Sequence, residues 1–91
     1  MTASDRIQRM RERLALLAPS DIAIVDDSHK HAGHAGARDG RGHFSLRIVA
    51  DAFRGQRPLA RHRLVYQALG DLMDTDIHAL AIQALAPEEQ A

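Results

Sequence analysis

Apolar residues near the start of the chain recur every three or four positions, as on one face of a helix. These positions are Ile7, Met10, Leu14 and Leu17. Ser4 is a suitable N-cap and Asp5 favours the positive end of a helix dipole, while Pro19 cannot continue a helix. The pattern therefore predicts a first helix that is capped by Ser4 and ends at about Ala18.

Two shorter stretches have the composition and alternation of strands. Residues 22–26 are rich in β-branched side chains and are bounded by polar turn formers. In residues 43–51, Phe44, Leu46 and Ile48 alternate with polar or smaller side chains, which is typical of a half-buried strand. We expect these two strands to pair as a hairpin.

The second half of the chain predicts one more helix and one more strand. Residues 53–58 form a turn, and Pro58 suits the first turn of a helix that runs to about Met73. An apolar stripe supports this helix, consisting of Leu64, Val65, Ala68, Leu69 and Leu72. Ile77 to Leu85 is the last strand, and a right-handed crossover places it parallel to the second. The predicted fold class is α/β, with a three-stranded mixed sheet and both helices on one face.

Periodicity stops between Ser28 and Gly42. This stretch holds four glycines, of which Gly42 is the last. It also holds three histidines, His29, His31 and His34. Loops longer than about 12 to 15 residues are uncommon in compact domains and are usually functional or disordered. Residues 28–42 are therefore the first indication of a functional segment.

Composition limits the classes of function. With 91 residues the chain has room for a single domain, 1–91. Twelve basic and twelve acidic residues give no net charge, so nucleic-acid binding needs a local patch. There is no cysteine, which leaves histidine to bind any transition metal. No stretch predicts a membrane span or a secretory signal, and we expect a cytoplasmic protein that is monomeric when alone.

Several motifs in a fixed order resemble one family, the BolA-like proteins. They are Asp27-Ser28-His29, His31-Ala32-Gly33-His34, His43-Phe44, Phe53-x-Gly55-x5-Arg61-His62-Arg63, Leu64-Val65-Tyr66 and Ile77-His78-Ala79-Leu80. The resemblance covers about residues 5–87 and implies a fold similar to a class II KH domain, in agreement with the predicted order of elements. The GxxG loop of RNA-binding KH domains is missing, so the resemblance does not imply RNA binding.

The resemblance also implies a partner and a cofactor. BolA-like proteins pair with monothiol glutaredoxins and share a bridging 2Fe–2S cluster, to which the glutaredoxin and its glutathione each give a thiolate. Carried over to this sequence, the strand ligand is His78 and the loop ligand is His31, with His34 as the alternative. Two histidines on one iron resemble the Rieske arrangement, and because imidazole binds as the neutral base, assembly is expected to weaken at low pH. The isolated chain is expected to hold no cluster.

Other interpretations of these residues remain open. Taken alone, a histidine in the position of His78 is more often a hydrogen-bonded residue at the edge of a core. The loop histidines are also suitable ligands for adventitious binding of zinc or nickel. His43 and His62 are interpreted as structural. Arg57, Arg61 and Arg63, with Arg54, are either a solvated face paired with some of the acidic residues or contacts for phosphate, glutathione or a partner.

The arginines support a second class of function, because some BolA-like proteins are described as DNA-binding transcriptional regulators. An enzyme is not predicted: Asp27, Ser28 and His29 are consecutive, and adjacent residues of an extended loop cannot converge on one substrate. The sequence thus predicts a cluster-sharing partner of a monothiol glutaredoxin in iron–sulfur trafficking or iron and redox regulation, with a DNA-binding regulator as the alternative.

Overall fold

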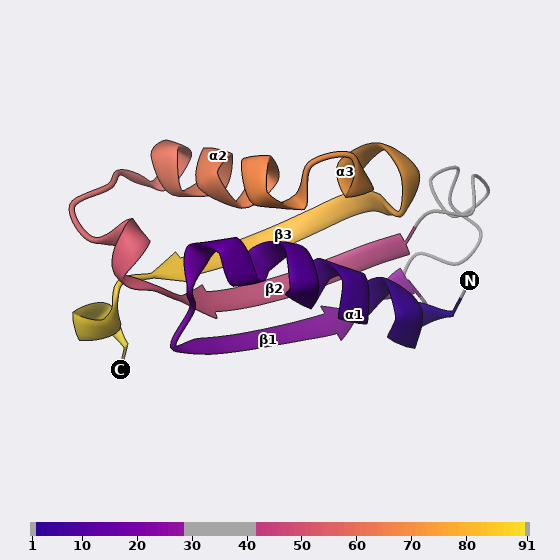
Figure 1. The fold of residues 1–91 in the computed structure, drawn as a ribbon, viewed down its shortest axis with the longest axis horizontal. Coiled ribbons are helices and arrows are strands. Elements are labelled where there is room, and N and C mark those ends of the chain that lie inside the picture. The colour runs from indigo at the N-terminus through magenta and orange to yellow at the C-terminus, as the bar shows by residue number, and fades with distance from the viewer. Residues whose placement is uncertain (1, 29–41, 91) are drawn as a thin grey trace.

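The computed structural model describes residues 2–28 and 42–90. Figure 1 shows helices and strands in two layers, with the helices gathered on one side of the sheet. The elements are α1 (Ala3–Leu14), β1 (Asp21–Asp26), β2 (Gly42–Val49), α2 (Pro58–Leu69), α3 (Leu72–Thr75) and β3 (Ile77–Leu85). Short 3-10 turns lie at residues 15–17, 51–53 and 87–89. The predicted fold class is confirmed.

The sheet has the order β1-β2-β3, so β2 is the central strand. β1 pairs with β2 in antiparallel register, with Ile24 opposite Leu46. β3 runs parallel to β2, as the right-handed crossover predicts, and Leu46 also lies opposite Ile82. Because β2 and β3 are parallel, their first residues lie at the same end of the sheet (Figure 1).

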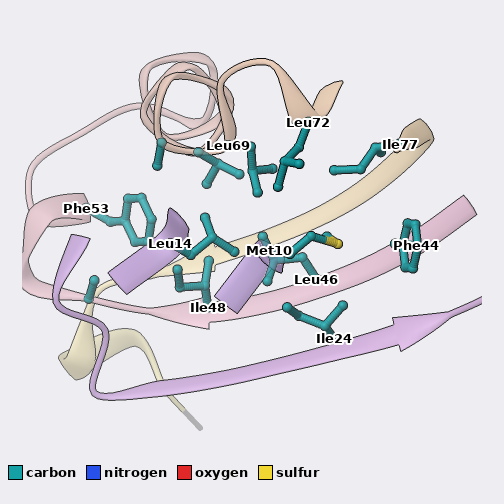
Figure 2. Close-up of a cluster of buried hydrophobic side chains, with 13 residues drawn as sticks. Met10, Leu14, Ile24, Phe44, Leu46, Ile48, Phe53, Leu69, Leu72 and Ile77 are labelled. Atoms are coloured by element: carbon teal, nitrogen blue, oxygen red, sulfur yellow. The ribbon is translucent and has the colours of Figure 1, made fainter. Parts of the chain in front are cut away.

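The core lies between the sheet and the helices. Figure 2 shows Met10 and Leu14 of α1 against the side chains of β2, with Leu69 and Leu72 on the other side of the cluster. Phe53, which the sequence places only in a turn, is completely buried in this cluster. The predicted apolar faces of α1, β2 and α2 therefore form one core. No helix in the described ranges is long and apolar enough to cross a membrane.

Two predicted helix boundaries are wrong. α1 is capped by Thr2 rather than Ser4: the Thr2 hydroxyl accepts from the Asp5 N–H at 3.1 Å, and the Asp5 carboxylate accepts from the Thr2 N–H. The second helix does not continue to Met73, because Gly70 takes φ 56° and ψ −129° and separates α2 from α3. This backbone region suits glycine, so the interruption is local to that residue.

The first α-helix ends at Leu14 rather than at about Ala18, because its last turn, residues 15–17, is a 3-10 helix. The first two strands differ from prediction by one or two residues at one or both ends. The first strand begins at Asp21, one residue before the prediction, and the second runs from Gly42 to Val49 rather than from 43 to 51. The last strand has the predicted bounds. Of the predicted loop 28–42, only its ends, Ser28 and Gly42, are among the described residues.

Candidate functional site

His78 is the second residue of β3 and its side chain is exposed, whereas the preceding Ile77 is fully buried. The register explains this position. Ile77 lies opposite Gly42, but the next pair is Ala79 with His43, so His78 is an extra residue in the ladder. Such a bulge redirects a side chain at the end of a sheet. The structure thus presents one imidazole at the shared end of β2 and β3.

A second imidazole lies against His78. The ring centroids of His43 and His78 are 5.1 Å apart and the ring planes are tilted by 47°. His43 is only 8% exposed. The sequence interpretation treats His43 as structural and does not predict its contact with His78. The spacing of 35 residues carries no signal for it, since the contact depends on the bulge register.

The two ends of the segment 29–41 are attached next to this histidine pair. The Ser28 hydroxyl accepts from the His43 N–H at 3.0 Å, and the His43 carbonyl accepts from the Asp27 N–H at 2.7 Å. At the other end, the Gly42 N–H donates to the Asp76 carbonyl at 2.9 Å, immediately before β3. His31 and His34, the predicted loop ligands, lie outside the described residues, as does His29.

A shallow depression of about 330 Å³ extends from His43 across the strands. Its lining residues are Asp27, His43, Phe44, Ser45, Ala79, Leu80 and Ala81. The Ser45 hydroxyl donates to the Asp27 carboxylate, and Ser28 is bound to the backbone of His43. Asp27 and Ser28 thus make separate contacts, one with a side chain of β2 and the other with its backbone.

The described residues alone do not make a metal centre. Within 2–28 and 42–90, no group of three or more histidine, aspartate or glutamate side chains is arranged to bind a metal ion. His62 lies in another part of the molecule, on α2 beside residues 82–84 of β3. At about 3.3 Å per strand residue, these positions begin about 13 Å from His78. A metal at His78 would need ligands from the segment 29–41 or from another molecule.

The predicted basic cluster separates into two kinds of arginine. Arg61 is engaged inside the protein: Nη1 donates to the Ala84 carbonyl at 2.9 Å and to Glu89 at 2.6 Å, while Nε donates to the Gln56 carbonyl. Its side chain is only 13% exposed. Arg54 makes two hydrogen bonds of 2.8 Å to the carboxylate of Glu88. These two arginines join the start of α2 and the preceding turn to the C-terminal turn.

The ion pairs also change protonation equilibria. The hydrogen bond from Arg54 holds the pKa of Glu88 below its ordinary value, and the hydrogen bond from Arg61 lowers the pKa of Glu89. The same contacts raise the pKa values of both arginines.

The other two arginines of the predicted cluster, Arg57 and Arg63, are exposed. Of the three arginines predicted to contact DNA or a partner, Arg57 and Arg63 are thus on the surface, and Arg61 is largely buried.

Comparison with known proteins places this geometry in a family. The family model described as BolA-like protein matches residues 14–89. The chain is 46% identical to SufE-like protein 1, chloroplastic/mitochondrial, of Arabidopsis thaliana over 92% of this chain and 24% of that protein. It is 44% identical to Protein BOLA1, chloroplastic, of the same plant, over 93% of this chain and 56% of that protein. The chain thus spans about a quarter and about half of these relatives.

A bacterial relative is matched over more of its length. The chain is 36% identical to the DNA-binding transcriptional regulator BolA of Escherichia coli, over 90% of this chain and 76% of that protein. Two of these relatives are named as chloroplastic, so the cytoplasmic location stays a prediction.

Solved structures agree with the sequence comparison. The BolA domain of SufE1 from Arabidopsis thaliana superposes with a TM-score of 0.82 at 41% identity, covering 99% of this chain and all of that one. BolA1 from the same plant gives a TM-score of 0.79 at 39% identity, covering 94% and 96% of the two chains. These matches extend along nearly the whole chain and agree with the order of motifs and with the mixed sheet, so the protein belongs to the BolA-like family.

Proposed function

We propose that this protein is a partner of a monothiol glutaredoxin and shares a bridging 2Fe–2S cluster with it, through His78 and a histidine of the segment 29–41. The observation that supports this most directly is the position of His78. Its imidazole is exposed at the end of the sheet where both ends of that segment are attached. The protein acts in this proposal as a binding partner in iron–sulfur trafficking or redox regulation, and not as an enzyme.

The donor set fits such a cluster. The chain has no cysteine, so it contributes nitrogen ligands, and imidazole is an established substitute for thiolate on one iron of a 2Fe–2S cluster. Two histidines there raise the reduction potential relative to four thiolates. His78 contributes an exposed imidazole, and His31 is the proposed second ligand, with His34 as its alternative. In this proposal, the remaining ligands are thiolates of the partner and its glutathione.

The test compares single histidine variants in a complex with a glutathione-loaded monothiol glutaredoxin. His78→Ala is expected to abolish the mixed-ligand spectrum in visible circular dichroism, because it removes the ligand that the strand holds in place. His62→Ala is the matched control, since His62 lies on α2 beside the other half of β3. A mixture of wild-type protein and glutaredoxin that gives only the spectrum of the glutaredoxin homodimer contradicts the proposal.

The two loop histidines are separated by the same titration. His31→Ala is expected to weaken or shift the spectrum, because His34 is three residues away and can replace it. The double variant His31→Ala with His34→Ala is expected to abolish the spectrum. Full retention of the spectrum in the double variant excludes both histidines as ligands.

DNA binding is the second candidate function. It is favoured by the exposed side chain of Arg57, the N-cap of α2, where a helix N-terminus also attracts anions. The exposed Arg63 in the middle of α2 and the name of the E. coli relative also favour it. The ion pairs of Arg54 and Arg61 with Glu88 and Glu89 reduce the number of cations available to phosphate. We therefore place it second.

A further inference from the structure

We infer that His43 is a positioning residue for His78: the imidazole of His78 packs against the buried ring of His43, and this contact determines its orientation. The inference deepens the proposed function, on which it rests for the role of His78 as a ligand. Its basis is the contact between the two rings, with centroids 5.1 Å apart and planes tilted by 47°. Tilted ring pairs at this separation are attractive and orientation-dependent.

The burial of His43 distinguishes positioning from ligation. Both ring nitrogens of His43 are inaccessible to solvent, and the residue is 8% exposed. A nitrogen in that state cannot reach a metal that is shared with another molecule unless the strand moves. His78 is exposed and can bind without such a movement. The structure therefore gives the two imidazoles different roles, one as the ligand and the other as its support.

His43 is well suited to be the rigid member of the pair. It lies in the central strand, and both polar groups of its backbone are hydrogen-bonded. The His43 N–H donates to Ser28 Oγ at 3.0 Å, and the His43 carbonyl accepts from the Asp27 N–H at 2.7 Å. His78 lacks an equivalent place in the ladder, because it is the extra residue of the bulge. Contact with a fixed ring restricts the rotamers of His78 before any metal arrives, which lowers the entropy lost on binding.

Residues that orient a metal-binding histidine commonly change metal affinity by about 10- to 100-fold when they are replaced. Removing the ring of His43 is expected to have an effect of this size on the stability of the shared cluster. The flat ring is the feature required, so phenylalanine at this position is expected to preserve the support that alanine removes.

The first measurement uses the isolated chain and needs no cluster. Three-bond couplings to Cγ of His78 report whether its χ1 angle occupies one rotamer or averages over several. We expect one rotamer in the wild type and in His43→Phe, and averaging in His43→Ala and His43→Gln. His62→Ala is the control and should not change the couplings. Identical His78 couplings in the wild type and in both ringless variants overturn the inference.

The second measurement follows cluster loss from the complex with glutaredoxin by visible circular dichroism. We expect loss to be about 10- to 100-fold faster in the ringless variants, and close to the wild-type rate in His43→Phe. Equal impairment of His43→Phe and His43→Ala overturns the inference, because a nitrogen and not the ring face would then be required. Thermal unfolding of each variant identifies those that keep the fold, and having two ringless variants retains the comparison if one unfolds.

The two measurements separate this inference from the proposed function. If the wild type forms no mixed-ligand cluster, the proposed function fails, yet the His78 couplings still decide whether His43 orients it. If the cluster forms and the couplings do not depend on His43, the inference fails and the proposed function stands.

Discussion

Gly42 is the residue on which the geometry of the site depends most closely. A Cβ atom built there would lie 2.6 Å from Cε2 and 2.8 Å from Cζ of Phe44, and 3.2 Å from Ser28 Oγ. Distances below 3.0 Å require something to move, and the Phe44 ring is only 2% exposed. Glycine thus lets the ring of Phe44 pack over the backbone at the bulge that presents His78.

Gly42→Ala is therefore expected to destabilise the protein by about 1–3 kcal/mol, the usual cost of overpacking a core. Urea unfolding measures the loss. The double variant Gly42→Ala with Phe44→Leu should lose less than the sum of the two single losses, because leucine removes the ring that the new methyl group meets. Ala81→Ser, at an exposed position of β3, is the control. Additive losses would mean that the clash with Phe44 is not the cause.

The sequence predicts individual site residues unevenly. His78 is a predicted ligand because of its family motif, and a short motif can be recognised without knowledge of the fold. The role inferred for His43 does not follow, because only the paired register of β2 and β3 brings the two rings together. Arg61 was predicted as a surface contact, but its partners Ala84 and Glu89 are 23 and 28 residues away. Contacts over such separations leave no local pattern.

At the scale of elements, periodicity predicts more. Three strands, their pairing directions and the two main helical regions all follow from apolar spacing and crossover handedness. The prediction fails where a single residue ends a helix. Leu72 continues the apolar stripe of α2, so the pattern hides the interruption at Gly70. At the start of α1, Thr2 and Ser4 are both suitable capping residues, and the pattern does not distinguish between them.

The C-terminal turn is an element held mainly by charge. Pro87–Glu89 carries the two glutamates that bind Arg54 and Arg61. The side chains of Arg54, Glu88 and Glu89 are about half exposed, whereas that of Arg61 is largely buried. Hydrogen bonds from the arginines hold the pKa values of Glu88 and Glu89 below their ordinary value in the folded protein. Their contribution to stability is complete above the unfolded-state pKa and is lost as pH falls through the lower folded-state values.

The double variant Glu88→Gln with Glu89→Gln is expected to be less stable than the wild type at about pH 7, and the difference should shrink as the pH falls toward about pH 3. Urea unfolding across this range measures it. Asp74→Asn, at an exposed position of α3, is the matched control. A difference that stays constant with pH would show that the glutamates act through packing and not through charge.

The whole molecule has no net charge, which limits what long-range electrostatics can do. Twelve cationic side chains are balanced by twelve carboxylates, and several of them are paired across elements, as Arg13 with Asp71 and Arg47 with Asp21 are. A neutral molecule does not steer toward DNA through its overall field. Any DNA binding therefore depends on a few exposed arginines.

These arginines lead to a quantitative expectation for the second candidate function. Each phosphate contact contributes about −0.9 to the slope of log affinity against log salt concentration, so Arg57 and Arg63 together give about −1.8. Three contacts, as the sequence suggests, would give about −2.7, but Arg61 is held by Glu89 and the Ala84 carbonyl.

Titration of a fluorescent duplex at several salt concentrations measures the slope. Arg57→Ala with Arg63→Ala should remove it, while Arg11→Ala, at an exposed position of α1, should leave it unchanged. A slope near −2.7 would show that the ion pair of Arg61 opens on DNA, and binding unaffected by the double variant would exclude this surface.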